Sequence, residues 1–446
     1  MALTVEPQVV AVEAPPQEPK GASGGPGMPA LIKRNTLLLT AAEAFVGTGQ
    51  QMVPTLSALI VMHLSGLAAL AGIGSSITGL TRALVSYPSG RLADIFGRKK
   101  VLVAGLLISL VGAVALGLSV LQMSFAGFVL ALLVFGLGNG ISQQQRRLSA
   151  ADFFPPERRG RGLGFVLTGS LVGALGGPVI IGAAGALAHG DMMGQLWISW
   201  MLVPLVIIPS LALILLIRPD PSVIARDLGR YWPGYEPSPQ APRQASDKVT
   251  LLTFARNYPH VVAFASMFVL FGNMSMMMSL APMTMTGDGM GLTVISLTVT
   301  LHVIGMYGLS VPVGRLADRV GRRPMLLAAV ALSTAGTVFV ALTHAPAPVI
   351  LGLFVVGMGW CAGNVSTAAI VADTTPVAIR GQAMGANSSC SAVASVGGPL
   401  LGGLLLQVFG PVALVGLTLI AVIPTTVLIL RLRETAPGQF AHPSRF

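Results

Sequence analysis

The stretch Gly90-Arg91-Leu92-Ala93-Asp94 is followed by Gly97-Arg98-Lys99, and together they form a short basic cassette. The same cassette returns later in the chain as Gly314-Arg315-Leu316-Ala317-Asp318 followed by Gly321-Arg322-Arg323. Both copies lie between long apolar stretches. A basic loop repeated in this way predicts two similar halves that lie side by side in a membrane.

Composition supports a membrane protein independently of the cassette. Hydrophobic residues make up 53% of the 446 residues, charged residues only 10%, and the mean hydropathy is +0.78. Such a chain lacks the polar surface that a water-soluble fold needs. A helix that crosses the hydrocarbon core takes about 20 apolar residues. Twelve stretches meet this requirement, at 37–63, 66–90, 100–121, 124–146, 160–187, 193–217, 257–285, 291–314, 324–344, 347–371, 380–407 and 410–432.

The twelve stretches divide into two groups of six. We expect an all-α membrane protein with pseudo-symmetric six-helix bundles at 37–217 and 257–432, joined by a cytoplasmic central loop at 218–256. Residues 1–36 and 433–446 are predicted cytoplasmic tails. The first tail is rich in Pro, Gly and Glu, which is typical of a disordered segment.

The repeat extends beyond the cassette. A shift of 221 residues superposes Asp152 on Asp373 and Arg159 on Arg380. Because the two cassettes are 224 residues apart, a three-residue indel separates the two registers. The halves are therefore predicted to be parallel copies, related by an axis along the membrane normal.

The basic residues predict the orientation. If the N-terminal tail is cytoplasmic, 26 of the 27 Lys and Arg residues fall in cytoplasmic loops or tails, and the opposite loops contain none. The net charge of +11 then reflects topology, because a nucleic-acid-binding protein would gather its charge on one soluble face. We expect a multi-pass protein of the bacterial inner membrane, with both termini cytoplasmic and no nucleic-acid partner.

Two charged residues fall inside predicted helices. Arg82 lies about 18 Å from the cytoplasmic end of the second helix, and Glu43 lies about 12 Å inside the first. A charge buried in lipid is costly unless it is paired. We therefore predict a Glu43–Arg82 ion pair. The pair either fixes the packing of the two helices or carries the protons that drive transport.

The cassette resembles the signature between helices two and three of the major facilitator superfamily, and the resemblance covers residues 37–432. It implies a transporter that works by alternating access, with a cytoplasmic latch that holds the outward-facing state. Arg98 can reach Asp152, as Arg322 can reach Asp373 in the second half. The alternative is that these charges only orient the loops during insertion. The predicted gate residues are Gly90, Asp94, Arg98, Asp152, Gly314, Asp318, Arg322 and Asp373.

The fifth predicted helix carries a glycine motif. Its elements are Gly173, Gly177-Pro178 and Gly182, and it resembles the antiporter motif of drug and proton exchangers in the superfamily, except that Ile181 replaces a glycine. Small residues also let helices pack closely, so packing alone is the alternative. The arginine that such exporters carry early in helix four is missing from the stretch 132–136.

Sulfur and imidazole side chains are expected at a similar depth in the membrane, in the seventh and eighth predicted helices. Met274 and Met278 share one helical face, as do His302 and Met306. Thioether and imidazole donors suit Cu(I). The two pairs resemble motifs of the CcoA-like copper importers, a branch in which some members look like riboflavin or other organic-solute transporters. Flexible methionines also suit an organic-substrate cavity or ordinary packing, and His302 is also a candidate proton carrier or a neutral packing residue.

Polar residues in the helices that line the pathway of the resembled fold are candidate substrate contacts. Each could instead bond across helices and contribute about 0.6–2 kcal/mol to packing. They are Gln50, Gln51, Asn139, Gln143, Asn273 and Asn364. The two cysteines, Cys361 and Cys390, both fall inside predicted helices, where we expect small buried residues.

The sequence predicts a secondary transporter and not an enzyme. We expect proton coupling through Glu43, Arg82 and His302, with export of an organic compound favoured. Uptake of copper or of a riboflavin-like nutrient is one alternative, and a non-transporting membrane scaffold is another. No phosphate-cradling loop occurs in the sequence, so ATP is not expected to be the direct energy source. We expect a monomer without a cofactor, whose partners are the lipid bilayer, protons and a small-molecule or metal-ion substrate.

Overall fold

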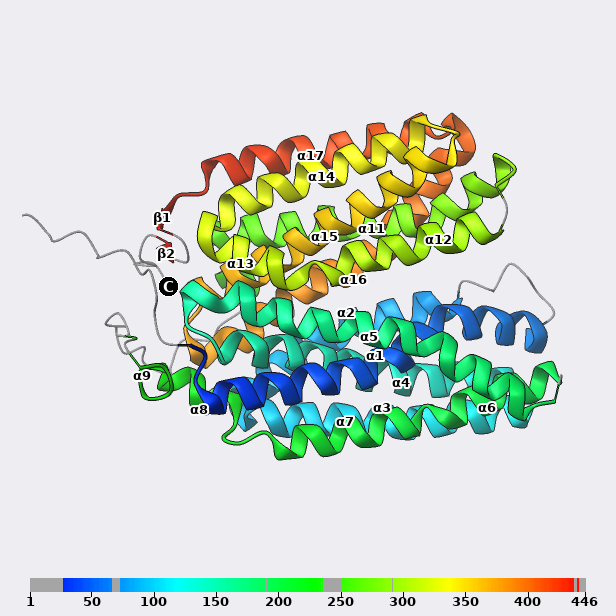
Figure 1. The fold of residues 1–446 in the computed structure, drawn as a ribbon, viewed down its shortest axis with the longest axis horizontal. Coiled ribbons are helices and arrows are strands. Elements are labelled where there is room, and N and C mark those ends of the chain that lie inside the picture. The colour runs from blue at the N-terminus through cyan, green and yellow to red at the C-terminus, as the bar shows by residue number, and fades with distance from the viewer. Residues whose placement is uncertain are drawn as a thin grey trace, which may run out of the picture.

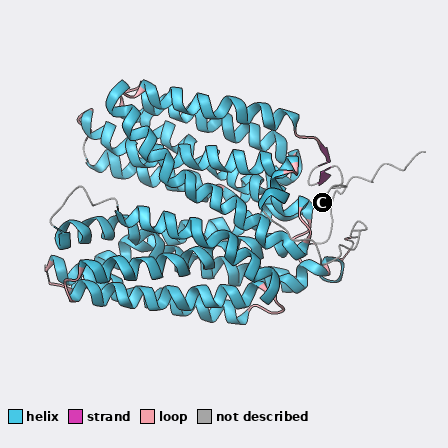
Figure 2. Cartoon of the chain, turned by 180° about the vertical axis from the view of Figure 1, so that it is seen from behind, coloured by secondary structure: helices cyan, strands magenta, loops and turns pink. Residues whose placement is uncertain are grey.

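The computed structural model describes residues 27–65, 73–189, 191–233, 235, 251–290, 292–436 and 439–440. Almost all of them are helical, and the helices form two stacked halves with the first half below the second (Figure 1). A short strand pair, β1 (Glu434–Ala436) and β2 (Gln439–Phe440), follows the last helix near the C-terminus (Figure 2).

The first half is built from the N-terminal helices. Its elements are α1 (Ala30–Ser65), α2 (Ile73–Phe96), α3 (Arg98–Leu121), α4 (Phe125–Asp152), the short turn η2 (Pro156–Arg158), α5 (Arg159–Leu187), α6 (Met192–Leu202) and α7 (Pro204–Leu216). Three short helices follow, namely α8 (Pro221–Arg226), α9 (Leu228–Tyr231) and α10 (Leu251–Ala255).

The second half repeats the arrangement. Its elements are α11 (Tyr258–Gly287), α12 (Leu292–Val303), the π-helical segment η3 (Ile304–Gly308), α13 (Ser310–Val320), α14 (Arg322–Leu342), α15 (Pro346–Thr374), the short turn η4 (Val377–Ile379), α16 (Arg380–Phe409) and α17 (Val412–Arg431).

The spans predicted from the sequence are present. Among the described residues, nine helical segments are long and apolar enough to cross a membrane, and the pair α12–α13 makes a tenth span with a bend of 43°. The helices α1 and α2 contain 36 and 24 residues; α1 packs against α5, and α2 packs against α4 and α16. The prediction of an all-α membrane protein is confirmed.

Two of the crossings are interrupted, for identifiable reasons. One residue separates the end of α6 from Pro204, which opens α7, and proline has no N–H to donate to the helix hydrogen bonds. In the second half, the π-helical turn η3 separates α12 from α13. Turns of this kind often mark functional positions in helices.

Equivalent helices make equivalent contacts in the two halves. The pairs α1–α5 and α3–α4 of the first half correspond to α11–α16 and α14–α15 of the second. The halves meet through two further equivalent pairs, α2 with α16 and α5 with α13. The predicted duplication is therefore visible in the packing.

One predicted boundary is wrong, and the difference affects the site. The fourth span was expected to end at residue 146, but α4 continues through Asp152. Arg146 is therefore fully buried and Arg147 half-buried within the helical bundle, so neither lies in a loop. The partition of 26 basic residues into cytoplasmic loops overstated the count for this reason.

Several predictions fall on residues outside the described part of the chain. They are the tail residues 1–26, the start of the second span at 66–72, most of the central loop at 236–250, and the last residues 441–446. The described part of the N-terminal tail already joins α1, which begins at Ala30.

Candidate transport site and gate

The contact predicted between Arg98 and Asp152 in the first half is present. Arg98, at the start of α3, donates from Nη1 to Asp94 Oδ1 at 2.5 Å and from Nε to Asp152 Oδ2 at 3.0 Å. All three side chains are almost completely buried. A buried carboxylate is stable only when it is paired and hydrogen-bonded, so these contacts hold α2, α3 and α4 together.

The same carboxylates also bind the second half. Arg380 of α16 donates from Nη1 to Asp152 Oδ1 at 2.7 Å. Asp94 accepts the backbone N–H groups of Gly381 and Gln382, both at 3.0 Å, and so caps the N-terminus of α16. The Arg98 Nη2 atom donates to the carbonyl of Val377 at 3.0 Å. We call this set of contacts the first latch.

A second latch repeats the first with the halves exchanged. Arg322 donates to Asp318 at 2.6 Å and lies 3.5 Å from Asp373. Arg159 of α5 donates to Asp373 Oδ1 at 2.5 Å. Asp318 accepts the N–H groups of Gly160 and Arg161 at 2.9 and 2.8 Å, and so caps α5.

Glycine allows the helices of each latch to approach. A Cβ atom at Gly90 would overlap the carbonyl oxygen of Gly381, and a Cβ atom at Gly314 would overlap the carbonyl oxygen of Gly160. Any larger residue at Gly90 or Gly314 would separate the two helices that the latch joins.

Sequence reasoning missed two carboxylates that support the latches. Asp220, just after α7, accepts the N–H groups of Arg98 and Lys99 at 3.2 and 3.0 Å. Glu434, just after α17, accepts those of Arg322 and Arg323 at 2.5 and 2.9 Å. Each carboxylate follows the last helix of its half by a few residues, which is the signal that could have revealed the pair.

Among the described residues, hydrogen bonds and ion pairs between the halves run from one end of the molecule to about the middle of α2 and α16. They join 82–98 and 144–168 of the first half to 310–322 and 373–395 of the second. We call this end the latch end. It is the end where α2, α4, α13 and α15 finish. The two halves are thus held together at the latch end, and their opposite ends share no such bond within the described residues.

The predicted Glu43–Arg82 pair is wrong. Glu43 forms an ion pair with Arg146 of α4 and accepts a hydrogen bond from Ser170 of α5 at 2.7 Å. Arg82 instead donates to Ser395 of α16 at 3.0 Å, and its guanidinium lies 5.2 Å from the centre of the Phe271 ring. The error follows from the predicted end of the fourth span at residue 146. That boundary counted Arg146 among the cytoplasmic loop residues and so removed it from the possible partners of Glu43.

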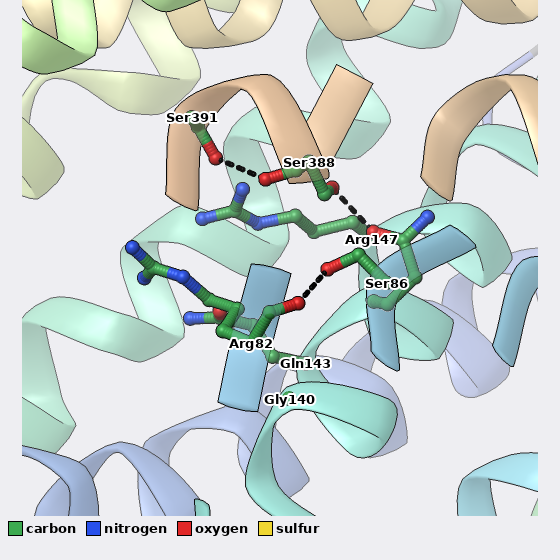
Figure 3. A pocket seen from close by; sticks show the side chains of 8 residues that line it. Arg82, Ser86, Gly140, Gln143, Arg147, Ser388 and Ser391 are labelled. Carbon is green, nitrogen blue, oxygen red and sulfur yellow. Dashed lines mark hydrogen bonds between the residues drawn. The ribbon is translucent and has the colours of Figure 1, made fainter. Parts of the chain in front are cut away.

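A small pocket lies between the halves beside Arg82 (Figure 3). Its lining comes from α2, α4 and α16, and Figure 3 shows the long side chains of Arg82 and Arg147 below the serines of α16. The space between these side chains is too narrow for a water molecule in this state. The lining residues are Arg82, Ser86, Gly140, Gln143, Gln144, Arg147, Ser388 and Ser391.

The predicted polar contacts have different surroundings. Gln143 lines the pocket, and Gln50 donates to Asn139 across α1 and α4 at 2.7 Å. The side chain of Gln51 lies outside the described part. Asn364 is buried in α15 and its side chain bonds no described residue.

Asn273 lies inside the second half. Its amide nitrogen donates to Ser333 and Thr337 of α14, both at 2.9 Å, and its oxygen accepts from Thr418 of α17 at 2.7 Å. These partners satisfy the amide within the bundle, which corresponds to the packing alternative.

The predicted sulfur and imidazole residues lie in the second half. His302 is fully buried, its Nδ1 atom is 2.6 Å from the carbonyl of Leu353, and its Nε2 atom has no hydrogen-bond partner among the described residues. Met306 and Met274 are buried, whereas Met278 is half-buried. No cluster of three or more His, Cys, Asp or Glu side chains suited to a metal occurs in the described part.

The glycine motif of α5 has a packing role at Gly173. A Cβ atom there would lie 2.7 Å from the carbonyl of Ala44 and 2.8 Å from Gly47, so the motif presses α5 onto α1. Gly177 is buried, whereas Gly182 is exposed and has no atom within 4 Å of the position of a Cβ. The side chain of Pro178 is outside the described part.

Comparison with known proteins gives the family. The model of the Major Facilitator Superfamily matches residues 39–261 and again residues 262–445, one match for each half. The chain therefore belongs to the Major Facilitator Superfamily, and it is a membrane transporter of that family. The resemblance of the cassette and the duplication of the fold are both explained by this membership.

Individual relatives extend the comparison. The chain is 26% identical over 379 residues to the uncharacterized MFS-type transporter YdeG of Bacillus subtilis, covering 84% of this chain and 86% of the relative. It is 26% identical over 358 residues to the riboflavin transporter RfnT of Brucella anthropi, covering 80% and 84%. The solved structure of the proton:xylose symporter XylE has the same fold, with a TM-score of 0.70, 16% identity and coverage of 92% and 98%.

Proposed function

We propose that this chain is a proton-coupled transporter of a small organic solute that works by alternating access between its two halves. The observation that carries the proposal is the placement of the mirrored latches at one end. Each latch contains buried ion pairs that join the halves and that separate when that end opens. The structure then corresponds to the state in which the cytoplasmic end is closed, given the orientation expected from the basic residues.

Glu43 supports the proton coupling. It is 5% exposed, it is paired with Arg146, and it contacts α5 through Ser170. Ionisable groups within membrane helices are costly and commonly carry function. Protonation of Glu43 removes its charge and leaves Arg146 unpaired, which alters the contacts that α1 makes with α4 and α5. A proton taken up at Glu43 is thereby linked to helix packing.

We propose export as the direction of transport, because the α5 motif resembles those of proton-driven exchangers. Helix packing also explains Gly173, so this motif alone does not determine the direction, and the assay must measure it. The relative RfnT makes riboflavin a suitable first probe.

The test uses purified protein in liposomes with an imposed pH gradient. Riboflavin is placed on one side and its movement is followed by fluorescence, for the wild type, Glu43→Gln and the exposed-loop control Asp227→Asn. We expect gradient-driven movement in the wild type and the control. Glu43→Gln is expected to retain riboflavin exchange between the two sides but to lose the response to the gradient. A gradient response that survives in Glu43→Gln contradicts coupling through this residue.

Uptake of Cu(I) is the second candidate. The observation in its favour is His302, whose buried Nε2 atom has no partner among the described residues, with Met306 one turn away on the same face. Uptake of Cu(I) into the same liposomes that is lost in His302→Ala favours this reading. A protein that moves neither probe and shows no change between its two states is a scaffold.

A further inference from the structure

The charges around the pocket do not balance. Arg82 and Arg147 line the pocket, and Arg146 precedes Arg147 in α4. Glu43 is the carboxylate in this group, and its ion-pair partner is Arg146. Two positive charges therefore have no carboxylate partner among the described residues.

The other carboxylates near this end are already used. Asp94 and Asp152 bind the arginines of the first latch, and Asp318 and Asp373 bind those of the second. Arg82 and Arg147 are half-buried, and a charge partly withdrawn from water without a partner is costly in a membrane protein. The pocket thus favours a negatively charged occupant.

The hydrogen-bonding groups point to the same kind of occupant. The Nε atom of Arg82 and the Nε2 atom of Gln144 are buried donors without a partner among the described residues, and both residues line the pocket. The Gln144 oxygen already accepts from Ser388, and the hydroxyl of Ser391 donates to the Ser388 carbonyl at 2.7 Å. Donors are in excess, so the pocket lacks an acceptor.

The size of the pocket limits what enters it. The pocket is nearly closed in this state, because the space between its side chains is too narrow for a water molecule. A carboxylate, phosphate or sulfonate group matches the fork of a guanidinium, and it enters here only when the halves move apart at this level. The pocket therefore suits the charged end of a larger solute.

Aromatic side chains lie on the second-half side of Arg82. The Phe271 ring, below the Arg82 guanidinium, is 5.8 Å from Trp360, and Trp360 is 5.5 Å from Tyr307. Tyr307 interacts electrostatically with both Arg82 and Arg147. The Nε1 atom of Trp360 has no partner among the described residues. This cluster offers ring faces and edges to a flat organic group.

We propose that the pocket between α2, α4 and α16 binds the oxyanion group of an aromatic organic anion, with Arg82 and Arg147 as its charge partners. The proposal rests on the transport function proposed above and names the substrate class for it. The anion bridges the halves, because the arginines belong to the first half and Ser388 and Ser391 to the second. Its binding is therefore linked to the relative position of the halves.

The test compares matched anionic and neutral probes on purified protein in detergent. Benzoate and inorganic sulfate are the anions, benzamide is the neutral counterpart, and chloride maintains the ionic strength. Thermal unfolding is measured for the wild type, Arg82→Gln, Arg147→Gln, Arg147→Lys and the exposed control Arg226→Gln. Benzoate at about ten times its dissociation constant is expected to raise the unfolding temperature of the wild type and the control by about 2 °C.

The expected pattern is specific to charge. Benzamide has no effect, Arg82→Gln and Arg147→Gln lose the response to benzoate and sulfate, and Arg147→Lys retains part of it because the charge remains. An equal response to benzamide, an unchanged response in both glutamine variants, or no response of the wild type to either anion overturns the inference.

A transport measurement separates this inference from the proposed function. Riboflavin movement by a protein that shows no response to anions leaves the transport function in place and overturns the anion site. Anion binding that depends on Arg82 and Arg147, in a protein that moves neither riboflavin nor benzoate, supports the site and contradicts the transport function.

Discussion

Arg380 of α16 and Asp152 of α4 form an ion pair across the two halves, with Nη1 and Oδ1 2.7 Å apart. Arg159 and Asp373 repeat this pair at 2.5 Å with the halves exchanged. Both carboxylates also lie beside an arginine of their own half. Each aspartate therefore holds its own half together and joins it to the other half.

Removing either partner of the Arg380–Asp152 pair should destabilise the protein, and removing Asp152 should have the larger effect. Asp152→Asn loses two arginine contacts, whereas Arg380→Gln loses one, so we expect the larger fall in unfolding temperature for Asp152→Asn. In the double variant the effects should fall short of additivity by about 0.5–3 kcal/mol. Thermal unfolding of the four proteins measures this coupling, and strict additivity would show that the pair contributes nothing.

The close approach at Gly90 should be essential to the closed latch end. A methyl group in Gly90→Ala overlaps the Gly381 carbonyl and costs about 1–3 kcal/mol of the closed state. Cys390 reports the change because it is half-buried beside Ser389, whose hydroxyl donates to Ala83 of α2. We expect faster labelling of Cys390 by a maleimide reagent in Gly90→Ala.

Two controls belong to the labelling experiment. Gly397 also lies in a helix but has no atom within 4 Å of a Cβ position, so Gly397→Ala should label at the wild-type rate. Cys361 is fully buried and should stay unlabelled in every folded sample. Equal rates in the two alanine variants would rule out a special role for Gly90.

The two capping carboxylates should both contribute to stability. Glu434→Ala removes the acceptor for two N–H groups at the start of α14, and loss of such a cap costs about 0.5–2 kcal/mol. Asp220→Ala should cost more, because Asp220 caps α3 through two N–H groups and also accepts from the N–H and hydroxyl of Ser222 at the start of α8. Asp227, which is exposed and caps no helix with its side chain, provides the control Asp227→Ala. Thermal unfolding should separate both cap variants from this control. A cap variant that unfolds together with the control contradicts the assignment.

Asn273 should contribute to the stability of the second half and not to solute binding. Asn273→Ala removes its bonds to α14 and α17, each of which contributes about 0.6–2 kcal/mol, so the unfolding temperature should fall. The affinity of the transported solute should stay within about threefold of the wild type, because a loss of packing leaves the contacts in the pocket unchanged. A large loss of affinity without a loss of stability would place Asn273 in the substrate path.

Much of the architecture could be predicted from the sequence because lipid restricts the choices. A chain that crosses the membrane must satisfy its backbone within helices, so apolar length alone located the crossings. The cassette and its distant aspartates then identified the Arg98–Asp152 and Arg322–Asp373 contacts. The arginines at the start of α5 and α16 superposed in the repeat, but nothing in the sequence indicated that each pairs with the opposite half.

The centre of the site could not be predicted for a specific reason. The polar run that ends α4, from Ser142 to Arg147, is typical of a helix end at the membrane surface. Neighbouring helices cover this run in the folded protein, and Glu43 pairs with Arg146 there. Sequence hydropathy does not include such tertiary cover. Arg82 was therefore the expected partner of Glu43, as the one basic residue assigned to the interior of a predicted span.

The central claim is that the latch end and the opposite end open alternately. Spin labels at Arg91→Cys and Arg315→Cys report the distance between the halves at the latch end. Labels at Met123→Cys and Ala345→Cys report this distance at the opposite end. Both pairs are placed in a protein that carries Cys361→Ala and Cys390→Ala. The two label-to-label distances are measured by pulsed electron resonance with and without Arg159→Gln and Arg380→Gln. The control carries Arg226→Gln and Arg230→Gln, at two exposed positions of α8 and α9. We predict that loss of the latch arginines lengthens the first distance and shortens the second, while the control changes neither. Two distances that stay unchanged, or that lengthen together, contradict alternating access.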